Sequence, residues 1–306
     1  MSHAHAHAHG HHHHHHHAPP QGARPDRRYA IAIVLNLAFV VLEAGAGFWA
    51  NSTSLLADAG HNLSDVLALA LAGGAAWLAQ KTSRGRRTYG FGKATILAAL
   101  LNALLLVLAC GAIGWEALRR FGEPQEIRTD AMMAVAAAGV VINLGTAFLF
   151  WRGRLDDVNV RGAFLHMAGD AAVSLGVVVA GLLIAVTGLV WIDTAASLLV
   201  VVLILIGTWG LLRESLDLAM DAAPESIELD EVHAFLKALP GVSGIHDVHV
   251  WNLSARETAL TAHLVRAEPA GRGFYDAAIR GLHEAFDINH VTLQVETEAV
   301  EGCPEC

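Results

Sequence analysis

Two histidine–aspartate pairs, each within an otherwise apolar stretch, are the residues best suited to chemistry. His61 and Asp65 are four positions apart, and so are His166 and Asp170. In a helix this spacing places both side chains on one face, a turn apart. If the two helices pack together, two imidazole nitrogens and two carboxylate oxygens converge, which is a ligand set for tetrahedral zinc. We therefore expect a divalent-metal site at these four residues.

The alternative is that the histidine and the aspartate of each pair hydrogen-bond only to each other. Matched spacing on two separate helices favours the shared site, because each ionisable group at bilayer depth costs roughly 2.5 to 3.5 kcal/mol. Cys110 is not placed with these ligands, and a site without thiolate favours a releasable divalent ion over Cu(I). Glu43 is a candidate for staging ions or protons, and Asp58 for a helix-start residue or a further ligand.

The composition indicates a membrane protein. Of 306 residues, 54% are hydrophobic and 16% charged, against roughly 45 to 50% and 25% in soluble domains. Six apolar stretches have the length of about 20 residues that crosses a bilayer. They span residues 29–50, 55–80, 94–118, 131–151, 162–187 and 190–212. We expect an α-helical membrane domain over 29–213 with both termini on one side.

Lysine and arginine near the helix ends predict the orientation. Eleven lie on the side of the termini and three on the other side. The positive-inside rule therefore predicts that both termini are in the cytoplasm. We expect the protein in the cell inner (plasma) membrane. A net charge of −9 argues against nucleic-acid binding, and three cysteines cannot build a disulfide framework.

The two ends of the chain differ in composition from the helices. After a linker at 214–223, residues 224–306 read as a soluble α+β domain with the order αββαβ, which is ferredoxin-like. Residues 1–28 hold eleven histidines and no apolar run, which predicts a disordered tail. The tail is either a purification tag or a metal-gathering segment, and its alternating His-Ala opening favours the second.

Several motifs resemble those of a known family, the cation diffusion facilitators, and within it the zinc transporters. They are Ser54-Leu-Leu-Ala-Asp58-Ala-Gly-His61-Asn-Leu-Ser-Asp65, Arg87-Thr-Tyr-Gly-Phe91, Asn159-Val-Arg-Gly-Ala163 running into His166-Met-Ala-Gly-Asp170, His246-Asp-Val-His249-Val-Trp251 and His290-Val-Thr-Leu-Gln-Val-Glu296. The resemblance implies a homodimer of six-helix protomers in a lipid bilayer, with cytoplasmic domains like metallochaperones. It also implies exchange of cytoplasmic zinc for protons, with His61, Asp65, His166 and Asp170 as transport ligands.

The resemblance also suggests accessory zinc ligands in the cytoplasmic domain. These are His246, His263 and Glu296, with His290 as a weaker candidate; His233, His249 and His283 are expected to be ordinary surface residues. Cys303 and Cys306 form one CxxC pair, which supplies two ligands and needs partners. The segment 80–93 holds no His, Asp, Glu or Cys, so we expect no metal site there.

These observations predict a secondary transporter, a proton-coupled antiporter that exports zinc, with cadmium, cobalt and nickel as further candidate cargo. Metal binding needs neutral imidazole and ionised carboxylate, so zinc and protons compete for the same groups. An intramembrane zinc metalloenzyme is one alternative, but no His-Glu-x-x-His motif accompanies the pairs. A membrane metal sensor is the other.

Overall fold

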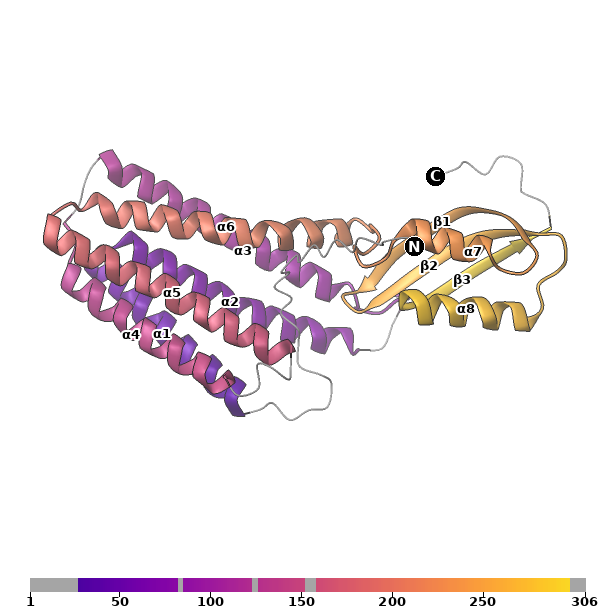
Figure 1. Ribbon diagram of the computed structural model, residues 1–306, viewed down its shortest axis with the longest axis horizontal. Helices are drawn as coiled ribbons and strands as arrows, with labels where there is room; N and C mark the ends of the chain where they lie inside the picture. The colour runs from indigo at the N-terminus through magenta and orange to yellow at the C-terminus, as the bar shows by residue number, and fades with distance from the viewer. Residues whose placement is uncertain (1–26, 82–84, 123–125, 152–157, 298–306) are drawn as a thin grey trace, which may run out of the picture. The chain divides into compact units, whose positions relative to one another are not determined.

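The computed structural model describes residues 27–81, 85–122, 126–151 and 158–297 (Figure 1). The histidines of the tail and the Cys303–Cys306 pair lie outside these ranges. The described residues pack into two compact units. The first combines the chain up to Leu67 with Leu105–Gly210, and the second combines Ala68–Leu104 with the chain from Leu211 onward.

Six long helices make up the first two thirds of the chain. They are α1 (Arg27–Ala50), α2 (Thr53–Ala79), α3 (Ala94–Gly122), α4 (Thr129–Phe150), α5 (Val158–Thr187) and α6 (Trp191–Ala219). The shortest has 22 residues, which at about 1.5 Å per residue spans the roughly 30 Å hydrocarbon core. Five of them are long and apolar enough to cross a membrane, and the apolar stretch Val34–Ala50 of α1 is shorter. The predicted class of α-helical membrane protein is confirmed.

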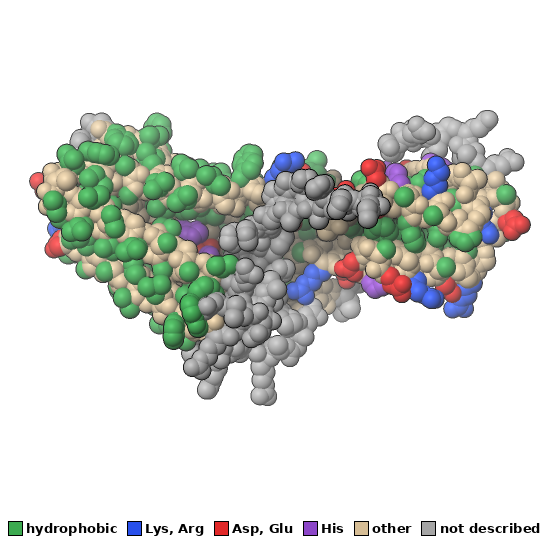
Figure 2. Space-filling view, viewed as in Figure 1, with side chains coloured by type: hydrophobic (Ala, Val, Ile, Leu, Met, Phe, Trp, Pro, Cys, Tyr) green, Lys and Arg blue, Asp and Glu red, His purple; other side chains and the backbone are tan. Residues whose placement is uncertain are grey.

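The outward surfaces of these helices are apolar, as lipid requires. Large hydrophobic side chains that would be costly in water stand exposed on every helix, for example Val41, Leu108, Phe148, Val186 and Ile206. Hydrophobic atoms dominate this part of the molecule in Figure 2. Lipid hydrocarbon cannot form hydrogen bonds with backbone N–H and C=O groups. The helices suit a bilayer because their backbone hydrogen bonds are made within each helix.

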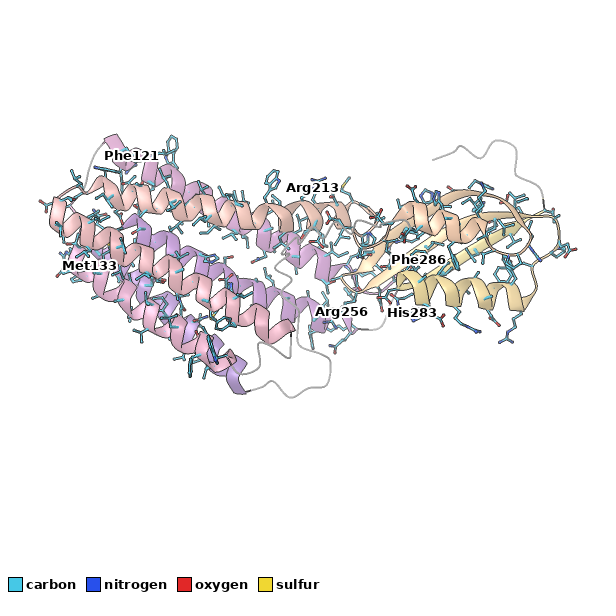
Figure 3. All side chains as sticks on the ribbon, viewed as in Figure 1. Phe121, Met133, Arg213, Arg256, His283 and Phe286 are labelled. Carbon is cyan, nitrogen blue, oxygen red and sulfur yellow. The ribbon has the colours of Figure 1, made fainter. Side chains whose placement is uncertain are left out.

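The helix α6 is longer than its apolar run. The prediction ended this helix at residue 212, but α6 continues to Ala219, past Arg213, which is labelled in Figure 3. The polar extension is supported by an i,i+4 ion pair, with Arg213 Nε 3.8 Å from Asp217 Oδ2. Helix therefore occupies the first six residues of the segment expected to be a linker, since hydrophobicity marks where a membrane span ends and not where a helix ends.

Tight packing holds the helices of the first unit together. The helices α4 and α5 lie side by side, with α1 against α4. Gly139 of α4 makes a close approach possible: a Cβ there would lie 2.7 Å from Phe39 Cζ of α1 and 3.0 Å from Ser174 Oγ of α5. A cluster of buried apolar side chains joins α2, α3 and α6; its members are Ala57, Leu106, Cys110, Val200 and Val201.

A buried aspartate fixes the start of α2. Asp193, in the first turn of α6, is fully buried and accepts hydrogen bonds from the backbone N–H groups of Thr53 (2.7 Å) and Ser54 (3.2 Å). The hydroxyls of Ser52, Thr53 and Ser54 also donate to it, at 2.7, 2.8 and 2.5 Å. These donors include N–H groups that a helix start leaves without an intrahelical partner. A residue of α6 thus caps α2, the helix that carries half of the predicted metal site.

The C-terminal part of the second unit has the predicted order αββαβ. Its elements are α7 (Leu229–Lys237), β1 (Val242–Ser254), β2 (Glu257–Arg266), α8 (Arg272–Phe286) and β3 (Ile288–Glu296). The sheet order is β1-β2-β3, with β1 antiparallel and β3 parallel to β2. Val232 and Leu236 of α7 and Leu282 of α8 pack on Leu260 and Leu264 of β2. Phe286, labelled in Figure 3, packs edge-on against Phe235 with ring centroids 5.9 Å apart.

Candidate metal site

The four predicted ligands converge between α2 and α5. His61 Nε2 lies 3.5 Å from Asp170 Oδ1 and 3.9 Å from Asp65 Oδ2. His166 Nε2 lies 3.3 Å from Asp65 Oδ2 and 3.7 Å from Asp170 Oδ2. Each histidine therefore faces the aspartate of its own helix and that of the other helix, and the two imidazole rings meet edge-on with centroids 6.2 Å apart.

These separations suit a small tetrahedral ion. Ligand atoms about 2.0 to 2.1 Å from zinc, at the corners of a tetrahedron, lie roughly 3.3 Å from one another. The four nitrogen–oxygen separations, 3.3 to 3.9 Å, are at or above this edge length. His61, Asp65 and Asp170 have ligand atoms within 4.8 Å of one another, and His166 lies outside this closest group. Asp170 Oδ2 is buried and accepts no hydrogen bond within the described residues, so it retains an unused acceptor for a cation. The donor set, two nitrogens and two oxygens, matches a borderline divalent ion.

The site is only partly covered by protein. The side chains of His61, Asp65 and His166 are 22%, 19% and 25% exposed, whereas that of Asp170 is 3% exposed. Figure 2 shows histidine and acidic atoms set among hydrophobic ones on the helical part. His61 and His166 are the two histidines of α1–α6. An ion at this position could therefore be reached from outside without unfolding a helix.

Two more acidic residues lie near the four ligands and are fully buried. Glu43 accepts a hydrogen bond from Asn62 Nδ2 at 3.1 Å, and Asp58 accepts one from Ser174 Oγ at 2.9 Å. Asp58 is not exposed at a mouth of the helical part, and it stands outside the group of candidate ligand atoms. Both polar contacts join different helices, α1 to α2 and α2 to α5.

A second cluster of metal-ligand types lies on the sheet of the C-terminal domain. His246 Nε2 is 3.2 Å from Glu296 Oε2, and His263 Nδ1 is 2.8 Å from Glu296 Oε1. His246 of β1 and His263 of β2 are directly opposite each other. Glu296 of β3 is opposite Val265, two residues after His263 on β2. The structure thus brings together the three accessory residues that the resemblance suggested.

A local irregularity of β1 adds a fourth side chain to this cluster. Asp247 has φ +52° and lies where the register shifts between His246 and His249. The bulge turns its carboxylate toward two rings: Oδ1 is 2.8 Å from His249 Nε2 and Oδ2 is 3.6 Å from His263 Nε2. Asp247 is not among the residues predicted from the sequence, although the run His246-Asp-Val-His249 holds three residues that can bind a metal and aspartate tolerates a left-handed conformation.

The electrostatics of the cluster favour ionised carboxyl groups. The hydrogen bond from His249 lowers the pKa of Asp247 below its ordinary 3.8, an effect that partial burial opposes. Burial raises the pKa of Glu296, but the hydrogen bonds from His246, His263 and Gln294 outweigh it, so the pKa is below the ordinary 4.5. Both carboxyls are therefore poised to act as anionic ligands near neutral pH.

The other candidate residues lie elsewhere. His290 packs edge-on against Tyr89, with centroids 5.6 Å apart, and is not in the cluster. His233 and His283 are exposed, as expected of surface residues, and His249 is about half-exposed beside Asp247. Asp193, Asn62 and Ser174 were not singled out from the sequence. A Ser-Thr-Ser run before a helix does signal a helix cap, but it does not show which distant residue completes it.

Six membrane-length helices that bring four side chains of metal-ligand type together, followed by a small αββαβ domain, define a class of protein: a multi-pass membrane protein with a candidate metal site between its helices. The cation efflux transmembrane domain model matches residues 29–218, and the model of the cytoplasmic domain of cation efflux proteins matches residues 224–298.

Curated relatives agree over nearly the whole chain. The chain is 34% identical to the zinc transporter ZitB of Escherichia coli, covering 92% of this chain and 90% of the relative. It is 35% identical to the metal cation efflux system protein CzcD of Cupriavidus metallidurans (90% and 88%), and 33% identical to the cadmium, cobalt and zinc/H(+)-K(+) antiporter of Bacillus subtilis (88% of each). The chain belongs to the cation efflux family, the cation diffusion facilitators.

Proposed function

We propose that this protein exports divalent zinc from the cytoplasm in exchange for protons, using His61, Asp65, His166 and Asp170 as the transport site. The observation that carries the proposal is the convergence of these four ligands, at 3.3 to 3.9 Å, between two membrane-length helices. A fixed structural ion would gain from complete burial, whereas three of these side chains are about one-fifth to one-quarter exposed. Partial exposure suits cargo that must enter and leave.

The relatives support this class of cargo. Their names include zinc transport, metal cation efflux, and antiport of cadmium, cobalt and zinc. We propose zinc as the main substrate, because imidazole nitrogens suit zinc better than they suit hard ions such as manganese. Cadmium, cobalt and nickel are further candidates.

Competition between metal and protons supplies the coupling. Zinc binds neutral imidazole and ionised carboxylate, so protonation of His61 or His166 weakens zinc binding. Histidine changes charge near neutral pH, which makes it suited to this exchange. A site that opens alternately to the two sides would take up zinc inside and release it outside as protons arrive.

The remaining features of the proposal concern assembly and topology. We propose a homodimer in the plasma membrane with both termini in the cytoplasm, since basic residues gather at the ends of the helices on that side. His246, His263 and Glu296 then form an accessory cytoplasmic zinc site, and Cys303 with Cys306 supplies ligands to another.

Zinc flux into proteoliposomes tests the proposal. The full-length protein should drive zinc uptake under an imposed pH gradient, with protons moving in the opposite direction. Asp170→Asn keeps the shape of the side chain and removes its charge, so zinc affinity and flux should fall on the order of 100-fold. Asp130→Asn, an exposed carboxylate on α4, is the matched control and should transport normally.

Two outcomes would contradict the proposal. Wild-type flux in folded Asp170→Asn would remove this residue from the site. Zinc flux that ignores the pH gradient and moves no protons would exclude antiport.

A further inference from the structure

Glu43 and Asp58 form a second buried polar group, distinct from the four metal ligands. Both side chains have no exposed surface. One oxygen of each accepts a hydrogen bond from a neutral donor, Asn62 or Ser174. The two carboxyl groups also lie within hydrogen-bonding reach of each other. The other oxygens, Glu43 Oε1 and Asp58 Oδ1, accept nothing from any donor in the described residues.

Within the described residues, the surroundings offer this pair no lysine or arginine, and His61 is the one neighbouring group that can carry a positive charge. The apolar spans of α1, α2, α4, α5 and α6 contain no lysine or arginine. The titratable groups that act on the pair are His61 of α2 and Asp170 of α5. The only one on α4 is the exposed Asp130, and Asp193 of α6 is occupied by Ser52, Thr53 and Ser54.

Two carboxyl groups in contact and buried, whose one possible cation, His61, already faces the carboxylates of Asp65 and Asp170, cannot both be ionised. Their charges would repel at close range, and each would lack the solvation that an anion needs. A hydrogen bond between two carboxyls requires that one of them supply the proton. The arrangement therefore holds one proton between Glu43 and Asp58, and Asn62 and Ser174 hold the two groups in place.

We propose that the Glu43–Asp58 pair is a proton-binding site that carries one of the protons exchanged for metal. The inference rests on the proposed antiport and deepens it, because it adds a proton carrier that is not itself a metal ligand. Asp58 precedes His61 by one helical turn, and Ser174 follows Asp170 by one turn. The pair is thus one turn from the metal site on both helices, at the end where α1 leads into α2.

This placement couples the two sites electrostatically. A divalent cation at the four ligands repels the shared proton, and a proton on the pair disfavours the cation. The coupling is reciprocal, since each ligand changes the affinity of the other by the same factor. Metal binding would release the proton to water on the cytoplasmic side, and a proton taken from the outer side would help to expel the metal.

Proton counting in proteoliposomes tests the inference on the full-length protein. Glu43→Gln and Asp58→Asn each remove the shared proton site while retaining side-chain size. We expect zinc affinity by calorimetry within roughly threefold of wild type. The number of protons moved per zinc ion, measured with an internal pH dye, should fall by about one. Asp130→Asn is the control with an unchanged proton count.

The outcomes separate this inference from the proposed function. If the wild-type protein moves no protons with zinc, antiport itself fails. If the wild type moves protons and both variants move the same number per zinc, the pair is not a carrier and the inference alone is overturned.

A second measurement decides the matter if the variants do not fold. Infrared spectra of the wild-type protein should show the carbonyl band of a protonated carboxyl group, which ionised carboxylates lack. Zinc addition should diminish that band. No such band, or a band that zinc leaves unchanged, would overturn the inference.

Discussion

The ligand residues owe their arrangement to the repeat of the helix. An i,i+4 spacing on α2 and another on α5 give two pairs, each on one face of its helix, and the approach of the two helices brings the four candidate ligands together. This much follows from the sequence. The distances between His61 and Asp170, or His166 and Asp65, do not, because they depend on how the two helices pack.

The balance of nitrogen and oxygen ligands should determine which ion is carried. In the variant His61→Asp an oxygen replaces an imidazole nitrogen, giving one nitrogen and three oxygens. Carboxylate-rich sites suit manganese better, so transport of manganese relative to zinc should rise by roughly tenfold. Competition assays in proteoliposomes measure the ratio. An unchanged ratio in a folded, active variant would show that His61 is not a ligand.

The carboxyl group of Glu296 should make the metal-free protein sensitive to acid. Its pKa is below 4.5 in the folded protein, because hydrogen bonds from His246 and His263 outweigh the effect of burial. A lowered folded-state pKa contributes stability above the unfolded value, and this contribution is lost as the pH falls through the folded value. The melting temperature should therefore drop more steeply below about pH 4.5 in wild type than in Glu296→Gln.

Calorimetry of the metal-free protein between pH 6 and pH 3 measures this difference, and Glu284→Gln, which removes an exposed carboxylate of α8, is the control that should keep the wild-type profile. Parallel pH profiles for wild type and Glu296→Gln would contradict the prediction.

At the scale of elements, long-range polar contacts set positions that periodicity leaves open. The six spans and the αββαβ order follow from hydrophobic patterns, whereas the end of α6 at Ala219 does not, because its last turns are polar and held by Arg213 and Asp217. The bulge at Asp247 also cannot be predicted from the sequence pattern, because a shift in strand register depends on the partner strand. Sequence patterns therefore predict which face of a helix or strand is buried and roughly how long that element is. Tertiary contacts determine where the element ends and where a strand is irregular.

The cap of α2 by Asp193 should be essential to the stability of the helical part. Asp193→Ala leaves two backbone N–H groups and three hydroxyls without their acceptor in a buried place. Unsatisfied buried donors cost about 1 to 3 kcal/mol each. We expect the thermal unfolding midpoint in detergent to fall by at least about 5 °C. Asp130→Ala, in the exposed first turn of α4, should change it little; an equal effect of both substitutions would argue against a specific cap.

At the scale of the whole molecule, metal-binding chemistry occurs in separate parts of the chain. The four residues of the proposed transport site belong to the first compact unit, and the cluster of His246, His263 and Glu296 belongs to the second. The His-rich tail and the Cys303–Cys306 pair add further ligand types at the two ends. Under the proposed function, ligands outside the helices can change how much zinc reaches the four residues without changing the site itself.

The tail provides the test of that division. Deleting residues 2–17 removes eleven imidazoles but none of the four transport ligands. Clustered histidines raise the local zinc concentration, so the deletion should raise the zinc concentration for half-maximal transport by roughly two- to tenfold and leave the maximal rate nearly unchanged. A variant of the same length with these histidines replaced by asparagine should behave like the deletion, because the imidazoles and not the chain length gather the ion. A large loss of maximal rate at saturating zinc would place the tail in the transport cycle, and identical kinetics at every zinc concentration would make it inert, as a purification tag would be.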